Sequence, residues 1–374
     1  MKKFFHILND EKFTDWIINS FEKMYPNQNE FFLISNNHSS TYFADSKVQF
    51  ITKSFFLNGF EPIKDSVFIF YYLHTHNISF LNKWKHFNYT KIWIGYGSDY
   101  YYYLLNSNSF HSLYLKNTSI LFNNINGYNI FKRIILNIYQ YFFFKLNVLP
   151  ALKSLNYFAP IIPNEYELIR DRYKYITFDY LEFTFGDLSY ILSSDEFTNG
   201  NDILLGNSAT FSTNHIDILD SFKDLNVLNK IILPLSYGNA KYKDYLLKII
   251  PDKYPEFKIQ LLDKFLPLNI YNSILNKCGF AIMPHLRQQA MGNIYSLLYS
   301  GTKLFLFKAN PVYDFLRKIN IIFYSIEDLL NDPSLLSSTL SFDDQEINRE
   351  IIIKYYSKEK SYQRIRDILE SEDL

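Results

Sequence analysis

Apolar and polar positions alternate between two kinds of segment along nearly the whole chain. Short continuous apolar runs, such as residues 67–70, suit strands that are buried on both faces of a sheet. Between these runs, apolar residues recur every three or four positions, as at Phe13, Ile17 and Phe21, which is the spacing of an amphipathic helix. Strands that alternate with helices predict parallel α/β units.

The expected strands form two groups. The first group comprises residues 4–8, 30–34, 66–71, 91–95 and 156–159. The second comprises residues 202–205, 231–235, 258–262, 280–283, 303–307 and 321–324. Helical patterns separate the strands of the second group, for example at residues 242–250, and this order predicts a Rossmann-like unit.

A polar stretch over residues 187–201, rich in Ser, Asp, Asn and Gly, predicts a linker between the groups. We therefore expect two Rossmann-like domains, residues 1–185 and 186–335, and a helical extension over residues 336–374. The predicted fold class is α/β with a cleft between domains, because ligands of such sheets bind at the carboxyl ends of the strands.

Composition narrows the classes of function. Lys and Arg together number 38, and Asp and Glu together also number 38, so the formal charges balance. There is no overall basic field of the kind that favours nucleic acid as a partner. The single cysteine, Cys278, excludes an intrachain disulfide and a cysteine-based zinc site. The apolar patch at residues 4–8 is too short for an export signal, and the chain lacks an apolar run long enough to span a membrane. We expect a cytoplasmic protein, soluble or lying on a membrane surface.

Gly206 follows the strand at residues 202–205 and precedes several small hydroxylated residues and the start of a helix. A glycine permits close approach of the backbone, and a helix N-terminus favours an anion. Asn207, Ser208 and Ser212 are therefore candidate phosphate ligands. The alternative is an ordinary turn in which Ser212 or Thr213 caps the helix.

A second candidate loop follows the strand at residues 280–283. Arg287 can hold a phosphate through two parallel hydrogen bonds, and Gln288 and Gln289 come next. Gly292 and Asn293 stand where a helix N-terminus would present backbone donors. Contact with a phosphate or a sugar is one interpretation, and a solvated loop is the other.

Two candidates for acid–base chemistry lie in the first half. Asp99 falls at the carboxyl end of a buried strand. It could be a general base for an acceptor hydroxyl or a cap for the helix that follows. His74 follows the strand at residues 66–71, and His76 lies two positions further on. No third ligand with suitable spacing accompanies this pair, so a hydrogen-bonding role is favoured over a metal site. His6 would face the cleft or lie in the core.

One aromatic segment has two interpretations. Lys132 and Arg133 precede an apolar run, and the aromatic residues at 139–144 lead to Lys145. Basic residues beside clustered aromatic residues are typical of a helix at a membrane surface. A buried helix in an aromatic-rich protein is the alternative.

The chain lacks the Asp-x-Asp, Gly-x-x-x-x-Gly-Lys, Gly-x-Gly-x-x-Gly and Gly-x-Ser-x-Gly patterns. Metal-dependent nucleotide chemistry, dehydrogenases and α/β-hydrolases are therefore disfavoured. The remaining patterns match a known family at these positions: His6 to Leu8, His74, Gly97 to Asp99 with Tyr101, Ile203 to Ser208 with Asn214 and His215, Pro234 to Tyr237, Arg287 to Gln289 with Gly292, and Asn310 with Pro311.

In these stretches the chain resembles the TDP-N-acetylfucosamine:lipid II N-acetylfucosaminyltransferases of enterobacterial common antigen synthesis, the 4-alpha-L-fucosyltransferases of glycosyltransferase family 56. The resemblance implies a GT-B fold and metal-independent transfer, with no cofactor, of a sugar such as N-acetylfucosamine from a nucleotide sugar such as a TDP sugar. The implied acceptor is a polyprenyl-diphosphate-linked saccharide at the inner face of the cytoplasmic membrane.

The resemblance also implies where each substrate binds. The donor belongs on the C-terminal domain, at Gly206, Asn207, Ser208, Ser212, Tyr237, Arg287, Gln288, Gln289, Gly292 and Asn293. The acceptor belongs on the N-terminal domain, with Asp99 as the first candidate for the catalytic base and His74 as the second. The sequence departs from the family's pattern in the loop after Asn207 and Ser208 and in the aromatic segments. The identities of the sugar and of the acceptor therefore stay open. Alternatives are a GT-B enzyme of another capsule or O-antigen pathway, a non-catalytic nucleotide-sugar-binding protein, and an epimerase.

Overall fold

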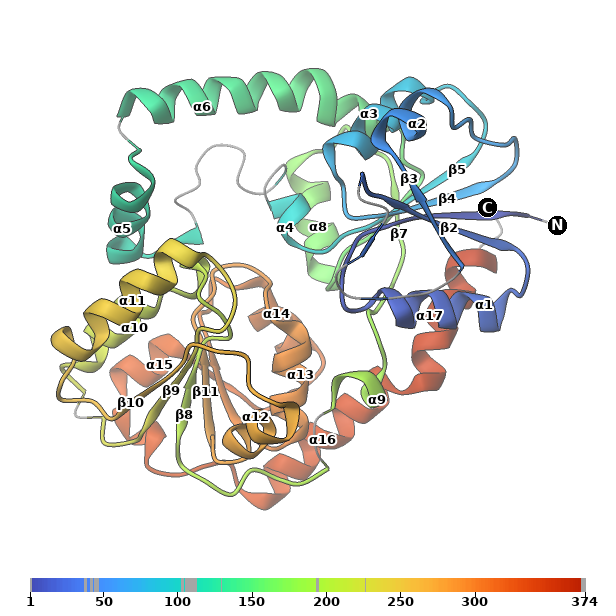
Figure 1. Cartoon of the computed structure of the whole chain (residues 1–374). Helices are drawn as coiled ribbons and strands as arrows, with labels where there is room; N and C mark the ends of the chain where they lie inside the picture. Colours follow the sequence, from blue (N-terminus) through green and yellow to red (C-terminus); the bar gives the residue numbers. More distant parts are fainter. Residues whose placement is uncertain are drawn as a thin grey trace. The chain divides into compact units, whose positions relative to one another are not determined.

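The computed structural model describes residues 2–36, 39–40, 43, 47–101, 104, 113–128, 130–192, 195–225 and 227–370. The chain forms two compact units, which are coloured along the sequence in Figure 1. Unit 1 comprises Met1–Asn108, Ile135–Asp187 and Lys358–Leu374. Unit 2 comprises Ser109–Ile134 and Leu188–Ser357.

Unit 1 contains a parallel sheet with the strand order β3-β2-β1-β4-β5-β6-β7. The strands are β1 (Phe4–Leu8), β2 (Asn29–Ile34), β3 (Val48–Ile51), β4 (Val67–Tyr71), β5 (Thr90–Ile94), β6 (Tyr157–Ala159) and β7 (Asp179–Tyr180). Every residue of β1 and β4 is buried, as expected for continuous apolar strands in the middle of a parallel sheet. The strand order reverses direction between these two neighbours.

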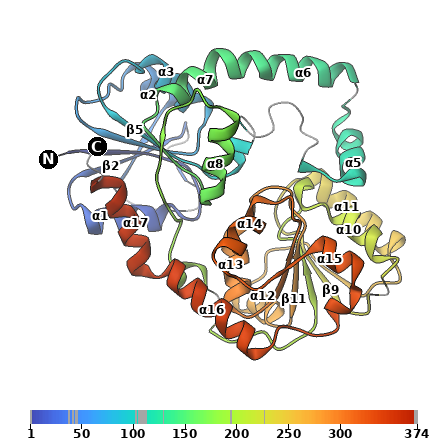
Figure 2. The same ribbon diagram turned by 180° about the vertical axis from the view of Figure 1, so that it is seen from behind.

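The helices of unit 1 cover this sheet. They are α1 (Thr14–Met24), α2 (Lys53–Asn58), α3 (Thr75–Lys83), the short α4 (Ser98–Tyr100), α7 (Leu149–Ser154), α8 (Pro163–Arg172) and α17 (Lys358–Glu370). Figure 2 shows α17 beside α1, and the two helices are in contact. Ile365 and Ile368 of α17 are fully buried in the same apolar cluster as Ile17 and Phe21. The buried Arg364 pairs with Glu182 at 2.7 Å, so α17 is an integral part of unit 1.

Unit 2 contains a second parallel sheet, with the order β10-β9-β8-β11-β12-β13. Its strands are β8 (Ile203–Leu205), β9 (Ile231–Pro234), β10 (Ile259–Leu262), β11 (Phe280–Met283), β12 (Lys303–Leu306) and β13 (Tyr324–Ser325). Its helices include α10 (His215–Phe222), α11 (Ala240–Lys253), α12 (Leu268–Leu275), α13 (Met291–Tyr299), α14 (Pro311–Lys318), α15 (Ile326–Asn331) and α16 (Phe342–Tyr356). Here the order reverses between β8 and β11.

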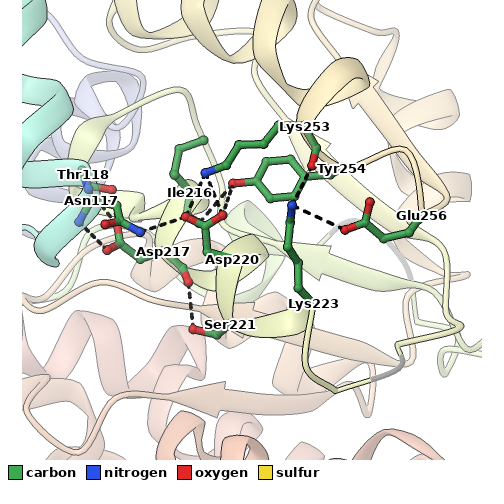
Figure 3. Close-up of polar contacts among 10 residues, drawn as sticks. All are labelled: Asn117, Thr118, Ile216, Asp217, Asp220, Ser221, Lys223, Lys253, Tyr254 and Glu256. Carbon is green, nitrogen blue, oxygen red and sulfur yellow. Dashed lines mark hydrogen bonds and ion pairs between the residues drawn. The ribbon is translucent and has the colours of Figure 1, made fainter.

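Helix α5 (Lys116–Asn126) joins unit 2 although it lies in the first half of the sequence. Asp217 of α10 accepts hydrogen bonds from the backbone N–H groups of Asn117 and Thr118, at 2.8 and 2.9 Å (Figure 3). The Thr118 hydroxyl donates to the same carboxylate at 2.6 Å. Asp220 accepts from the side chain of Asn117 and pairs with Lys253 at 2.7 Å. The first turn of α5 is therefore capped by another helix, which satisfies its otherwise unpaired backbone donors.

In the structure the chain passes from unit 1 to unit 2 after Asp187, and neither unit is one continuous stretch of sequence. Residues 109–134 belong to unit 2, and residues 358–374 return to unit 1. The short strands β3 and β7 were not expected, because the polar Gln49 and Asp179 interrupt their apolar pattern. Strand β13 begins at Tyr324, three residues after the start of the expected strand at residues 321–324.

Candidate functional site

Each sheet places polar side chains where its strand order reverses. In open parallel sheets, ligands bind beyond the carboxyl ends of the two strands that flank such a point. In unit 2 these strands are β8 and β11, and the loops after them contain Gly206 and Arg287. In unit 1 they are β1 and β4, and the loops after them contain Asn9 and His74.

Gln289 joins the loops after β8 and β11. Its Oε1 atom accepts a hydrogen bond from the Ser212 hydroxyl at 2.6 Å. Its Nε2 atom donates to the Thr210 hydroxyl at 3.1 Å and to Asn207 Oδ1 at 3.3 Å. These contacts use both ends of the carboxamide, so Gln289 fixes the two loops relative to each other.

The loop after β9 is attached to the same network. Asn207 Nδ2 donates to the Tyr237 hydroxyl at 2.9 Å. The backbone N–H of Ala209 donates to the carbonyl of Tyr237 at 2.8 Å. Gly238 has φ +123°, and a Cβ atom there would lie 2.5 Å from the carbonyl oxygen of Ala209. This close approach requires a glycine, which lets Tyr237 reach Asn207.

Arg287 precedes the uncapped N-terminus of α13. The residue is half-buried, and its Nη1 atom donates to the carbonyl of Gln288 at 2.9 Å. Ala290 at the N-cap has φ +60° and makes no side-chain capping bond. The first backbone N–H groups of α13, including those of Gly292 and Asn293, have no acceptor within the helix. A guanidinium and a helix N-terminus in one loop suit a phosphate.

Two histidines outside the set of expected site residues lie beside these loops. His285, which follows β11, is fully buried, and neither ring nitrogen has a hydrogen-bond partner among the described residues. His215 is also buried, and its Nδ1 atom contacts the Tyr242 hydroxyl at 3.2 Å. Burial lowers the pKa of His215 to about 3 and that of His285 well below its usual value. Both rings are therefore neutral near pH 7. The sequence signals were the family resemblance at His215 and the position of His285 after β11.

Replacement of Gly206 by alanine should disrupt the loop after β8. Gly206 has φ +70°, and an added Cβ would lie 2.0 Å from Thr213 Cγ2 and 3.2 Å from His215 Nε2. The left-handed conformation costs about 1–2 kcal/mol for alanine. Overpacking adds roughly 1–3 kcal/mol. We expect the free energy of unfolding of unit 2, measured in urea, to fall by the sum of these two costs.

The matched control is Gly127→Ala. Gly127 has φ +61°, but an added Cβ would meet nothing within 4 Å. This variant carries the conformational cost without the steric cost, so it should be the more stable of the two. Equal losses in the two variants would contradict the crowding at Gly206.

The buried histidines predict acid sensitivity. The pKa of His6 in unit 1 and of His215 in unit 2 is lowered by burial from 6.5 to about 3. Between these values the unfolded chain binds protons that the folded chain does not, so stability falls as the pH drops below 6.5. Each histidine should contribute a slope of about 1.4 kcal/mol per pH unit. Urea unfolding at pH 7 and 5 measures the slope, and a His215→Gln variant with the parental slope would contradict this assignment.

In unit 1, His74 lies where the sheet order reverses. Its Nε2 atom lies 2.9 Å from Asn9 Oδ1. An amide oxygen accepts hydrogen bonds, so Nε2 carries the proton and the lone pair is on Nδ1. His74 is half-buried, and burial lowers its pKa from 6.5, which favours the neutral ring. A neutral imidazole with a basic Nδ1 atom can accept a proton from a hydroxyl.

The backbone before His74 is strained. Tyr72 has φ +72°, a conformation that bulky residues rarely adopt. Its carbonyl accepts from Asn77 Nδ2 at 2.9 Å, and the next backbone N–H, of Leu73, donates to Asp99 Oδ2 at 3.0 Å. Such strain persists where surrounding contacts enforce it, and here these contacts set the position of His74.

Asp99 is fully buried and saturated by hydrogen bonds. Besides Leu73, the indole of Trp93 donates to Oδ2 at 2.9 Å, and the backbone N–H of Tyr96 donates to Oδ1 at 3.0 Å. Desolvation raises the pKa of Asp99, and these hydrogen bonds lower it in part. No observation tests the catalytic base directly, so the role of Asp99 stays a prediction. Its contacts favour a carboxylate that fixes the loops after β4 and β5.

The other two histidines of unit 1 named above, His6 and His76, pack against neighbouring side chains. His6 lies in the core, with Nδ1 3.1 Å from the Tyr71 hydroxyl and Nε2 3.1 Å from Asn29 Oδ1. The ring of His76 stacks on that of His74, with centroids 4.9 Å apart. The part of the chain that the structure describes contains no group of three or more His, Cys, Asp or Glu residues arranged to hold a metal.

The donor residues expected from the sequence therefore come together in unit 2, with one difference in role. Asn207, Ser212, Tyr237 and Gln289 share a hydrogen-bonded network beside Gly206, while Ser208 contacts Thr210 at 3.2 Å. Gln288 is buried under the loop. We expect it to support the loop rather than to contact a ligand.

Comparisons with known proteins bear on the family and on the fold. The sequence model of the family described as 4-alpha-L-fucosyltransferase, glycosyl transferase group 56, matches residues 186–357, which include every expected donor residue. The fold is similar to that of alpha,alpha-trehalose 6-phosphate synthase from Burkholderia multivorans, with a TM-score of 0.58, 7% identity, and coverage of 99% of this chain and 96% of that chain.

Two other solved structures show the same similarity. Sucrose-phosphate synthase from Thermosynechococcus elongatus has a TM-score of 0.59 and 7% identity, and 99% of each chain is covered. An apo structure of OtsA has a TM-score of 0.62 and 8% identity, with 98% of this chain and 99% of that chain covered. These similarities concern the fold, and they confirm the predicted GT-B class of two parallel α/β domains.

Proposed function

We propose a specific transfer reaction for this glycosyltransferase. The proposal starts from the match of residues 186–357 to the 4-alpha-L-fucosyltransferase family of glycosyl transferase group 56. The enzyme moves an amino-deoxyhexose such as N-acetylfucosamine from a nucleoside diphosphate, TDP, to a polyprenyl-diphosphate-linked saccharide. The family match carries the proposal, because it covers the unit whose loops after β8 and β11 suit a diphosphate.

The donor diphosphate binds at the N-terminus of α13. Arg287 and the backbone N–H groups of Gly292 and Asn293 supply positive charge and donors. Gly206 allows the sugar-nucleotide to approach the backbone after β8. The network of Asn207, Gln289 and Tyr237 holds this loop in place before the donor arrives, which limits the entropy lost on binding.

Transfer forms one bond and breaks one bond. The acceptor oxygen bonds to the anomeric carbon, and the bond from that carbon to the diphosphate oxygen breaks. The leaving diphosphate takes the electron pair, and its growing charge is stabilised by Arg287 and the donors of α13. We propose that these groups serve in place of a metal ion.

The proton of the acceptor hydroxyl must be taken up by a base, and we assign this base to unit 1. Direct attack by a hydroxyl requires a base, and His74 Nδ1 is a basic atom at the carboxyl edge of that sheet. We assign His74 as the base and Asp99 as the residue that positions it through Leu73. This reverses the order expected from the sequence, because the Asp99 carboxylate is buried and occupied by structural hydrogen bonds.

Nucleotide binding tests the donor assignment. A ligand that binds only the folded protein raises its melting temperature. We expect TDP to raise the melting temperature of the purified protein more than UDP does, with the same shift in EDTA. TDP-sugar and a lipid-linked saccharide should then give product in EDTA. Absence of a shift with every nucleoside diphosphate would contradict the donor site, and a shift abolished by EDTA would contradict metal independence.

A further inference from the structure

Helix α6 (Ile130–Phe143) carries large apolar side chains that point away from the protein. Phe131, Ile135 and Tyr139 are 78%, 66% and 63% exposed. The exposed apolar residues of α6 are Phe131, Ile134, Ile135, Ile138, Tyr139, Tyr141 and Phe142. They recur every three or four positions and so form one stripe along the helix, named here the α6 stripe.

The opposite side of α6 is the half-buried one. Leu136, Asn137, Gln140 and Phe143 are of intermediate exposure. An amphipathic helix of a globular protein turns its apolar face inward, and α6 does the reverse. Among the described residues, α6 has no extensive contact with another helix or strand. Contiguous exposed apolar residues of this kind mark an interaction surface, whereas single ones do not.

The stretch of sequence that contains the α6 stripe carries basic residues and no acidic ones. No Asp or Glu occurs between Asp99 and Glu165, although Lys116, Lys132, Lys145 and Lys153 lie in that interval. Lys132 and Lys145 are exposed near the two ends of the stripe. Lys145 lies over the ring of Tyr141 at 5.9 Å. The side chain of Arg133 lies outside the described residues. Exposed apolar and aromatic residues beside exposed lysines match the chemistry of an anionic bilayer surface.

We propose that α6 binds the surface of an anionic lipid bilayer, with the α6 stripe inserted among the headgroups and the lysines against lipid phosphates. None of the helices in the described part of the chain has the length and apolar character required to cross a bilayer. The purpose of this binding, access to a lipid-linked acceptor, rests on the proposed function; the binding itself does not. A second copy of the chain would cover the stripe equally well, but it would not account for this basic stretch of sequence.

Vesicle flotation of the full chain tests the proposal. We expect the protein to float with vesicles of phosphatidylglycerol and phosphatidylcholine, and less with phosphatidylcholine alone. An Ile135→Gln/Ile138→Gln variant should reduce the vesicle-bound fraction at least about tenfold, because two apolar side chains leave the interface. Glutamine is a good helix former, so α6 itself should persist.

The matched control makes the same two changes at exposed positions of another helix. Ile347 and Ile353 of α16 are 44% and 42% exposed, and Ile347→Gln/Ile353→Gln should bind vesicles as the parent does. Equal binding by the parent and the α6 variant would overturn the proposal. So would a parental dimer, detected by sedimentation without lipid, that the α6 variant converts to a monomer without losing flotation.

A separate readout distinguishes this inference from the proposed function. The α6 variant should keep the parental thermal shift with TDP, because the donor loops lie in other segments of the chain. Loss of flotation with an intact TDP shift supports lipid binding by α6. If flotation depends on α6 but no nucleoside diphosphate binds, the surface assignment stands and the proposed donor is wrong.

Discussion

Arg287→Ala is expected to reduce kcat/KM for the nucleotide sugar by roughly 100-fold, the usual cost of removing one group that stabilises a developing anion. Arg287 is half-buried beside the N-terminus of α13. The expected loss appears both in the affinity for the nucleoside diphosphate and in kcat, since the charge on the leaving group grows during the reaction. Steady-state kinetics with the nucleotide sugar and a thermal shift with TDP measure the two parts.

Two further variants make this result specific. Arg287→Lys keeps the charge but loses the two-pronged hydrogen bonding, so its kcat/KM should lie between that of the parent and that of Arg287→Ala. Arg317→Ala removes an exposed arginine of α14 in the same unit and should leave kcat/KM within about twofold of the parent, as for most surface changes. Unchanged donor affinity and rate in Arg287→Ala would eliminate its role at the phosphates.

His74→Gln should lower kcat by roughly 100- to 1,000-fold, the typical contribution of a general base. In the parent, kcat/KM should decrease at low pH as His74 becomes protonated. Burial lowers the pKa of His74 from 6.5, so this decrease begins below pH 6.5. This decrease is the acidic limb of the pH profile. The variant lacks the group that titrates there, so its residual kcat/KM should not show the same acidic limb.

His76→Gln and Asp99→Asn separate the competing interpretations. His76 stacks against His74 without an assigned role, so His76→Gln should retain both the rate and the acidic limb. Asp99→Asn places an amide in a site filled by N–H donors, and it should lower the free energy of unfolding by about 1–3 kcal/mol. Its residual activity should keep the acidic limb of His74. A flat pH profile in Asp99→Asn, with the limb retained in His74→Gln, would make Asp99 the base.

The buried parallel strands were predictable because a strand covered on both faces must be apolar throughout. Expected strands at residues 4–8 and 280–283 coincide with β1 and β11 for this reason. The candidate donor loops were predictable because glycine, arginine and glutamine between a strand and a helix have few packing roles. Edge strands such as β7, with Asp179, lack this signal, since one side of an edge strand meets solvent.

Features that depend on tertiary contacts could not be predicted in this way. Nothing local to residues 116–126 indicates that Asp217 caps them from another helix. The sequence likewise shows a carboxylate at Asp99 but not its burial against Trp93, and burial is what distinguishes a positioning residue from a base. His285 follows a strand like many other residues. What distinguishes it is that its ring nitrogens have no hydrogen-bond partner in the described part of the chain.

The path of the chain between the two units has a consequence for synthesis on the ribosome. The chain leaves unit 1 after residue 108 and again after residue 187, and it returns at residues 135 and 358. Unit 2 therefore has its full complement of residues once residue 357 has emerged. Unit 1 begins first but still lacks Arg364, Ile365 and Ile368, which fill its core and pair with Glu182. The unit translated first is thus completed last, and a chain stalled before α17 would contain a complete unit 2 and an incomplete unit 1.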